Sequence, residues 1–349
     1  MLADARRLAL ALAIGAVGAG VFWWLRLPLA FLLGALSTTA IAALCKAGVA
    51  VPNRLRGIMV ALLGATIGAS FTPEVLANAG RWLASLGVVT VSVGLMSCIA
   101  YACFRRFGGF DRVTSFFGAA PGGLAVMTVT GEAMGGDPRS IALVHTARIV
   151  VVVFAVPIHI KLTQHIDLPS TVALAGSSLG FAPLGLAQAA VAALAGHLLA
   201  RLVRLPGASI IGPMLVSAAA HLTGLFQAVP PVWLVAATQL VMGAAIGARF
   251  AGFPLRAMGN AMLAGAVVST LMMTVAVVIS LLAAEPFGIS PVALLLALAP
   301  GGLAEMCLVA VALNVDPAFV ATMHIIRLIL VVVLAPLLFR LLAKPTPSR

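Results

Sequence analysis

The amino-acid sequence predicts an all-α polytopic membrane protein made of two homologous halves. The first observation is its composition: 62% of the 349 residues are hydrophobic, 9% are charged, and the mean hydropathy is +1.18. The second is a series of apolar runs near the 20 residues that a helix needs to cross a bilayer. The third is that the two halves repeat one another, and each contains a Pro-Gly-Gly break within an apolar segment.

Twelve apolar segments define the repeat. The first half contains segments at about 8–25, 28–46, 55–72, 82–104, 113–134 and 140–161. The second half contains segments at about 184–203, 206–224, 233–251, 257–283, 290–313 and 319–342. These limits predict a first membrane repeat at 1–162, a linker at 163–183, a second membrane repeat at 184–342 and a short C-terminal tail at 343–349.

Rare residues recur between the halves at an offset of 178 or 179 positions, which chance similarity between apolar segments does not produce. The matched polar residues are Asp137 with Asp316, His145 with His324, and Arg148 with Arg327. The matched motifs are Arg26-Leu27-Pro28 with Arg204-Leu205-Pro206, Val51-Pro52 with Val229-Pro230, and Gly64-Ala65-x-Ile67-Gly68 with Gly243-Ala244-x-Ile246-Gly247. The paired glycines of the last motif predict close helix packing.

The two breaks are the centre of the predicted binding site. Ala120-Pro121-Gly122-Gly123-Leu124 recurs as Ala299-Pro300-Gly301-Gly302-Leu303. Proline removes a backbone donor, and glycine leaves the helical conformation easily. Irregular backbone at membrane depth persists only where protein or a water-filled cavity satisfies its polar groups. The two breaks therefore predict a transporter-type site near the bilayer midplane.

The distribution of Lys and Arg predicts the topology. If the fifth segment of each half is a re-entrant hairpin, sixteen Lys and Arg lie on the inner side and three on the outer side. If all twelve segments cross the membrane, the division is twelve to seven. The first arrangement gives about ten transmembrane helices plus two Pro-Gly-Gly hairpins, and it makes the halves inverted repeats. The alternative is that the broken helix crosses the membrane and another segment lies flat on its surface. It gives similar counts, so both arrangements remain possible.

Charged residues inside apolar segments are costly and therefore candidate functional residues. Arg148 follows His145 by three positions, and Arg327 follows His324 in the same way, so each pair shares a helix face. One interpretation is that each arginine binds a small anionic solute, helped by the helix N-termini that the breaks expose. The other is an internal ion pair with Asp137 or Asp316, or an arginine that reaches the membrane surface.

Glu305 lies inside the second broken segment, where the first half has Val126. A carboxylate beside a backbone break is a candidate site for a coupling proton or sodium ion, and pairing with Arg148 or Arg327 is the alternative. Asp137-Pro138 and Asp316-Pro317 each precede a helix, which indicates N-terminal capping.

Several classes are disfavoured by the sequence. The formal charge of +12 comes from Lys and Arg spread over short loops, which is typical of membrane proteins rather than of a nucleic-acid-binding face. The cysteines and histidines lack metal-ligand spacing, and no nucleophile lies beside a base. We therefore expect no metal, no cofactor, no direct contact with nucleic acid and no enzymatic activity. The expected partners are the lipid bilayer and a small solute, and a homo-oligomer is compatible with these features.

The repeated Arg-Leu-Pro, Gly-Ala-x-Ile-Gly-Ala, Ala-Pro-Gly-Gly-Leu and His-x-x-Arg motifs resemble the membrane-bound AbrB family of bacteria over nearly the whole chain. The resemblance implies a multi-pass protein of the bacterial inner membrane, in a family whose members are often labelled regulators of gene expression. It does not extend to the soluble DNA-binding regulator of the same name. Two functions are therefore predicted: a secondary transporter or exporter of a small anionic solute, or a membrane-embedded regulator that acts indirectly on gene expression.

Overall fold

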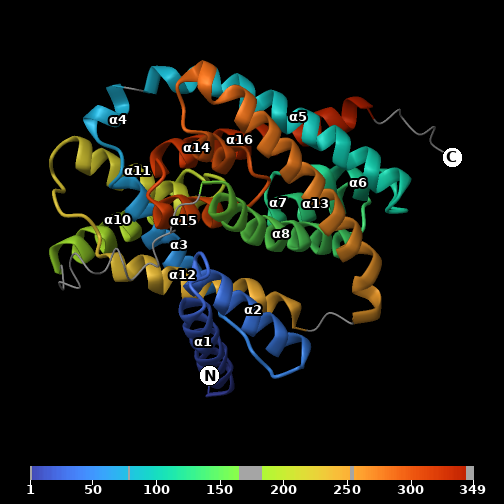
Figure 1. The fold of residues 1–349 in the computed structure, drawn as a ribbon, viewed down its shortest axis with the longest axis horizontal. Coiled ribbons are helices and arrows are strands. Elements are labelled where there is room, and N and C mark those ends of the chain that lie inside the picture. The colour runs from blue at the N-terminus through green and yellow to red at the C-terminus, as the bar shows by residue number, and fades with distance from the viewer. Residues whose placement is uncertain (1, 78, 165–182, 252–254, 343–349) are drawn as a thin grey trace. The chain divides into compact units, whose positions relative to one another are not determined.

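In the computed structural model the described part of the chain consists of helices joined by loops and turns, and it contains no strand; the description omits residues 1, 78, 165–182, 252–254 and 343–349 (Figure 1). The first half contains α1 (Leu2–Trp24), α2 (Ala30–Leu44), α3 (Asn53–Gly68), α4 (Pro73–Ala77), α5 (Trp82–Arg106), α6 (Arg112–Ala119), α7 (Leu124–Ala133) and α8 (Pro138–Gln164). The second half contains α10 (Pro183–Leu202), α11 (Ala208–Leu222), α12 (Val232–Gly247), α13 (Leu255–Ala283), α14 (Pro291–Leu298), α15 (Leu303–Leu313) and α16 (Pro317–Leu342). Three short 3₁₀ turns, η1 (Ala79–Arg81), η2 (Ala248–Phe250) and η3 (Glu285–Phe287), join them.

The helix limits confirm that the chain is duplicated. The starts of α6 and α14, of α7 and α15, and of α8 and α16 are each 179 residues apart. α2 and α11 are offset by 178, and α3 and α12 by 179, because the loop before α12 is one residue longer. Pro52 and Pro231 are consequently the equivalent N-cap residues, with almost the same backbone angles. The sequence analysis had matched Pro52 with Pro230, which precedes the equivalent residue Pro231 by one position.

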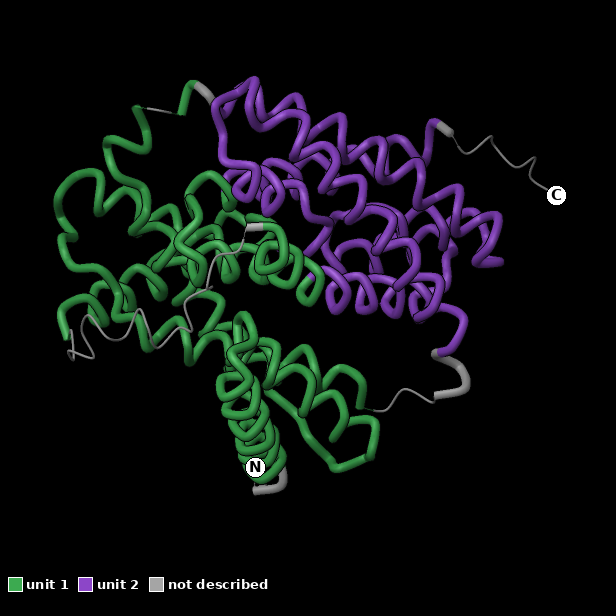
Figure 2. The backbone as a smooth tube through the Cα atoms, in the orientation of Figure 1, with its two compact units in different colours: residues 1–80, 153–255, 304–321 green, residues 81–152, 256–303, 322–349 purple. Residues whose placement is uncertain are grey.

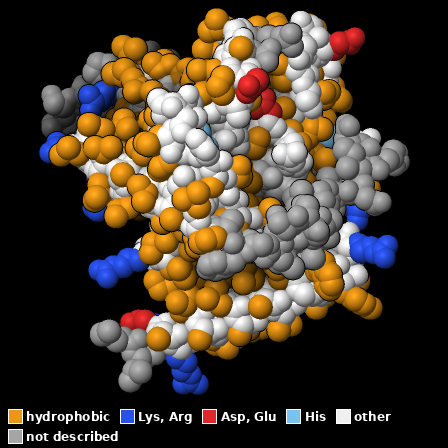
Figure 3. Space-filling model, turned by 90° about the vertical axis from the view of Figure 1, so that its left-hand side faces the viewer, with side chains coloured by type: hydrophobic (Ala, Val, Ile, Leu, Met, Phe, Trp, Pro, Cys, Tyr) orange, Lys and Arg blue, Asp and Glu red, His pale blue; other side chains and the backbone are white. Residues whose placement is uncertain are grey.

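The described chain is that of a polytopic membrane protein. Seven of its helices are long and apolar enough to cross a bilayer: α1, α5, α8, α10, α12, α13 and α16. Four shorter apolar helices accompany them in the described part of the chain: α2, α7, α11 and α15. The total of about ten transmembrane helices stays a prediction. Hydrophobic side chains are spread over the face seen in Figure 3, and Lys and Arg side chains project near its edges. Such an apolar exterior is stable in lipid and not in water.

The helices form two compact units, and each unit takes segments from both halves (Figure 2). Unit 1 contains residues 1–80, 153–255 and 304–321, and unit 2 contains residues 81–152, 256–303 and 322–349. The predicted repeats at 1–162 and 184–342 describe the duplication of the sequence, and their limits stay predictions. The predicted linker falls almost entirely on residues 165–182, and the predicted tail on 343–349, outside the described residues.

In unit 1 the helices pack through glycines, as the small-residue motifs predicted. A Cβ atom on Gly64 would collide with the carbonyl oxygen of Ile210, and one on Gly243 would collide with that of Leu32, the equivalent contact in the other half. Met59 and Thr238, which are also equivalent, meet each other, with 4.0 Å between the sulfur and the hydroxyl oxygen. Contact between equivalent residues places a local two-fold axis between α3 and α12.

Unit 2 holds the first Pro-Gly-Gly segment between long helices. The rings of Phe116 and Phe117 on α6 lie 5.2 and 5.5 Å from the ring of Phe339 on α16. Gly265 on α13 lets that helix approach Val144 and Ala147 of α8, since a Cβ atom there would meet both residues within 3.0 Å. These contacts fix α8 and α16, which carry the candidate site residues, against the broken segment.

Candidate functional site

Both Pro-Gly-Gly motifs interrupt their helices, as the sequence predicted. α6 ends at Ala119, Ala120 is extended with ψ 125°, and α7 begins after Gly123 with φ 90° and ψ 133°. In the second half, Ala299 is extended with ψ 130° between α14 and α15. Each break leaves helix-end carbonyls on one side and helix-start N–H groups on the other without partners in the helix itself.

The first broken segment is a hairpin. The backbone N–H of Asp137, just beyond α7, donates to the hydroxyl oxygen of Thr114 at the start of α6, at 2.8 Å. A Cβ atom on Gly136 would touch Val113, and one on Gly131 would touch Phe117. The two ends of the segment therefore lie side by side, with Pro121, Gly122 and Gly123 at its tip. This geometry is compatible with the re-entrant arrangement that the charge counts favoured, and the side of the membrane on which the two ends lie stays a prediction.

The pair His145 and Arg148 on α8 binds the carbonyl oxygens at the end of α6. Arg148 donates to the carbonyl oxygens of Ala119 and Ala120 at 3.3 and 3.4 Å. The Nε2 atom of His145 lies 3.0 Å from the carbonyl oxygen of Phe117. Because a carbonyl can only accept, Nε2 carries the proton, which leaves Nδ1 to accept from the Arg148 guanidinium.

The pair His324 and Arg327 on α16 repeats this arrangement in the second half. The Nε2 atom of His324 donates to the carbonyl oxygen of Leu296 at 2.9 Å, and Arg327 donates to its Nδ1 atom at 2.8 Å. Arg327 also donates to the carbonyl oxygens of Ala299 and Gly301 at 2.6 and 2.7 Å. Both pairs therefore satisfy carbonyls at the negative end of a broken helix, a position where a cation is stabilising. Sequence analysis identified these residues but missed their carbonyl partners.

Both arginines belong to unit 2, each is only 4% exposed, and the two guanidinium groups act on one another electrostatically. The carboxylates that the sequence places in unit 2 are all exposed: Asp111, Glu132, Asp137 and Glu285. Asp111 and Asp137 are moreover engaged as helix N-caps. Unit 2 therefore contains two buried positive charges that act on one another.

Asp137 and Asp316 are caps, as predicted. Asp137 accepts hydrogen bonds from the backbone N–H groups of Arg139 and Ser140, each at 3.1 Å. Asp316 accepts from the backbone N–H of Phe319 at 3.1 Å. Burial raises the pKa of Asp137, but the hydrogen bonds from Ser140 and Arg139 outweigh it and hold the pKa below its ordinary value. For Asp316 burial prevails and raises the pKa.

Glu305 belongs to unit 1, where its carboxylate oxygen lies 3.9 Å from a guanidinium nitrogen of Arg56. Arg249, at the end of α12, interacts electrostatically with both Glu305 and Arg56. Sequence analysis placed Arg56 and Arg249 among the loop charges and missed their role. A comparison of the two halves could have identified them, because neither arginine is repeated. Val235 is equivalent to Arg56, and Ser70 is equivalent to Arg249.

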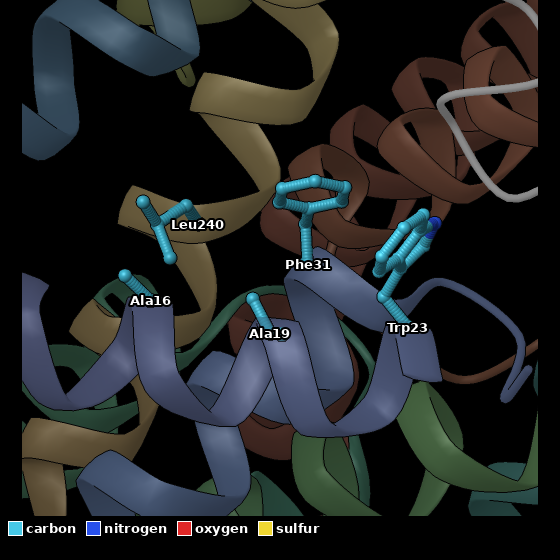
Figure 4. Close-up of a pocket in the computed structure, with 6 residues that line it drawn as sticks. Ala16, Ala19, Trp23, Phe31 and Leu240 are labelled. Atoms are coloured by element: carbon cyan, nitrogen blue, oxygen red, sulfur yellow. The ribbon is translucent and has the colours of Figure 1, made fainter. Parts of the chain in front are cut away.

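Two further features of the described residues bear on the candidate site. No cluster of three or more His, Cys, Asp or Glu side chains occurs among them, and their four cysteines are free. A recess on unit 1 is lined by Ala16, Ala19, Gly20, Trp23, Phe31 and Leu240 from α1, α2 and α12 (Figure 4). This recess is apolar, and none of the predicted site residues lines it.

The fold and the site define a class: a duplicated all-α membrane protein with two helix breaks, in which a buried His–Arg pair binds the carbonyls at each break. A family model described as "Transition state regulatory protein AbrB" matches residues 31–343, and the chain belongs to this AbrB family. It is 29% identical to "Uncharacterized protein YhjN" of Bacillus subtilis (strain 168), over 80% of this chain and 77% of that protein. It is 24% identical to "Putative regulator AbrB" of Escherichia coli (strain K12), over 94% of each chain.

Proposed function

We propose that this protein is a secondary transporter of a small anionic solute in the bacterial inner membrane. One observation carries the proposal: Arg148 and Arg327 are both buried in unit 2, and each binds carbonyl oxygens at a helix break, so that positive charge is concentrated at both breaks. Two like charges in a low-dielectric interior repel each other, and an anion bound near both lowers that repulsion. Guanidinium groups also match the oxygens of carboxylate, sulfate and phosphate groups.

The tip of the first hairpin supports the same proposal. Gly123 is exposed at the start of α7, whereas Pro121 and Gly122 are buried. The first N–H groups of a helix have no partner within the helix and carry its positive dipole end. An anion near the guanidinium groups would be bound by these N–H groups as well. The His–Arg pairs would then serve two purposes, since they fix the break and supply its positive charge.

The coupling ion in this proposal is a proton rather than sodium. Glu305 was the candidate cation site, and it is 3% exposed with the guanidinium of Arg56 at 3.9 Å. Two arginines near this carboxylate repel a sodium ion. The proposal is compatible with a monomer or a homo-oligomer.

The test is uptake of radiolabelled anions by inverted and right-side-out vesicles from cells that overproduce the protein. We expect at least one among a panel of carboxylates, amino acids, sulfate and phosphate to accumulate with the wild-type protein. Arg148→Gln and Arg327→Gln should abolish that uptake. Arg340→Gln, an exposed change on the same helix as Arg327, should leave it intact.

Folding is checked in parallel by the melting temperature in detergent, with Arg327→Lys as the conservative variant. Lysine retains the charge but cannot contact two carbonyls with one planar group, so it should restore uptake only in part. The proposal is wrong if no anion accumulates with the wild-type protein. It is also wrong if folded Arg148→Gln and Arg327→Gln transport the anion as Arg340→Gln does.

The second candidate function is that of a membrane-embedded regulator, which is favoured by the printed name of the Escherichia coli relative, "Putative regulator AbrB". We propose that any such effect on gene expression is indirect and follows from the solute that is moved or bound. Transcript profiles of a deletion strain complemented with Arg327→Gln distinguish the two. Restoration of the wild-type profile by a transport-inactive variant would favour regulation that is independent of transport.

A further inference from the structure

We infer that unit 1 contains a second oxyanion-binding site, formed by Arg56 and Arg249 beside Glu305. Its arginines are not among the residues proposed to bind the transported anion, although Glu305 is also the candidate site of the coupling ion. The ligand of the second site is a small oxyanion or the phosphate group of a lipid. Arg56 lies in the first turns of α3, Arg249 in the turn that ends α12, and Glu305 in the first turn of α15. All three belong to unit 1.

The first argument is the balance of charge. Glu305 is almost fully buried, and its carboxylate is paired with Arg56 at 3.9 Å, a separation too long for a strong hydrogen bond. Arg249 lies within electrostatic range of both and adds a second positive charge. One carboxylate thus faces two guanidinium groups, and the cluster has a net charge of +1. An ion pair that only fastens Glu305 would need one arginine.

The second argument is that the cluster has unused donors. The Nε atom of Arg56 and the Nη1 atom of Arg249 are both buried and have no hydrogen-bond partner among the described residues. Buried donors in proteins are nearly always satisfied, and guanidinium N–H groups match the oxygens of carboxylate, sulfate and phosphate groups. The Arg56 side chain is 33% exposed, so a ligand can reach the cluster from the surface.

The third argument comes from the duplication. Arg56 belongs to the first half of the chain, and Arg249 and Glu305 belong to the second. The residues at the equivalent positions are Val235, Ser70 and Val126, so none of the three charges is repeated. By contrast, the His–Arg pairs occur in both halves. The duplicated fold therefore does not require this cluster, and a cluster with net positive charge and unpaired donors is suited to an anion.

The experiment is isothermal titration of the purified protein in uncharged detergent, first with inorganic phosphate and then with short-chain phosphatidylglycerol, at constant ionic strength. We expect at least one probe to bind. Arg56→Gln and Arg249→Gln should each weaken that binding at least tenfold. Arg54→Gln, an exposed change of the same charge on the same helix as Arg56, should leave it unchanged.

Glu305→Gln separates a binding site from a structural ion pair. Because Glu305 competes with the ligand for the guanidinium groups, this change should tighten binding severalfold. If the charges are only structural, the change should lower the melting temperature and leave probe binding absent. Arg249→Lys, which keeps the charge, should retain part of the affinity and controls for loss of folding.

The outcomes also separate this site from the proposed transport site. Binding that is lost in Arg148→Gln but kept in Arg249→Gln would overturn the inference and leave the transport proposal in place. Binding that is lost in Arg249→Gln and kept in Arg148→Gln would support it, whatever the uptake assay shows. Binding of phosphatidylglycerol alone identifies the ligand as a lipid phosphate, and binding of neither probe overturns the inference.

Discussion

Gly123 at the tip of the first hairpin allows a quantitative test of the helix break. Its φ of 90° and ψ of 133° lie in a region that side-chain-bearing residues rarely adopt. An alanine Cβ atom there would meet one atom within 4 Å, the Leu328 Cδ1 at 3.7 Å, which is an ordinary contact. The cost of Gly123→Ala therefore comes from backbone strain alone, and we expect a loss of about 2 kcal/mol in the free energy of unfolding.

The matched control is Gly94→Ala on α5. Gly94 is exposed within a helix of the same unit, and an added Cβ atom would meet no atom within 4 Å. Alanine is the better helix former, so this change should stabilise the protein by about 0.5–1 kcal/mol. Gly123→Ala should therefore be less stable than the wild type and Gly94→Ala more stable, so that the two variants differ by about 2.5–3 kcal/mol in the free energy of unfolding.

Equilibrium unfolding in mixed micelles, followed by circular dichroism, measures both variants. If Gly123→Ala is as stable as Gly94→Ala, Gly123 does not adopt a positive φ in the folded protein. The helix would then not be broken at this residue. At a temperature where the double change of Gly122 and Gly123 to alanine remains folded, we also expect uptake to be lost. The reason is that a continuous helix would no longer present free N–H groups at the tip.

Three further predictions test the topology, the packing and the capping. In a cysteine-free background, Phe107→Cys and Glu132→Cys should label equally with an impermeant thiol reagent, because the ends of the hairpin meet; labelling from opposite sides contradicts this. Gly64→Ala should destabilise the protein because the backbone of α11 blocks its Cβ atom, whereas Gly57→Ala on the same helix meets no atom within 4 Å and should not. Asp137→Ala should cost about 1 kcal/mol at neutral pH. Because the folded-state pKa of Asp137 is lowered, this difference should persist above the ordinary pKa of Asp and vanish as the pH falls through the folded-state value.

The breaks and the duplication could be predicted from the sequence because their causes are local or periodic. Proline followed by two glycines ends a helix wherever it occurs, and helix starts at Arg112 and Pro291 preserve the offset of the repeated motifs. The hairpin followed from charge, since re-entry collects the Lys and Arg on one side. These features depend on neighbouring residues and on the membrane, and the three-dimensional contacts were not needed to infer them.

The partners of the charged residues could not be predicted, since they depend on contacts between segments far apart in the sequence. Arg148 was expected to bind either a solute or a carboxylate, and its structural partners are carbonyl oxygens at the end of α6. Main-chain carbonyls occur at every residue, so no sequence pattern indicates which of them an arginine will meet. Glu305 was expected to pair with Arg148 or Arg327 if it paired at all. It lies beside Arg56, which comes from the opposite end of the chain.

A duplicated protein brings equivalent residues together at its local two-fold axis, and the kind of residue found there constrains its role. In unit 1 the residues that meet are Met59 and Thr238, which pack without electrostatic cost. In unit 2 the equivalent residues Arg148 and Arg327 act on one another electrostatically. Because both are positively charged, they repel each other. Helix-end carbonyls offset part of that repulsion, but a neutral donor would cap them without it. We therefore propose that the repeated charge serves an anion bound between the two copies.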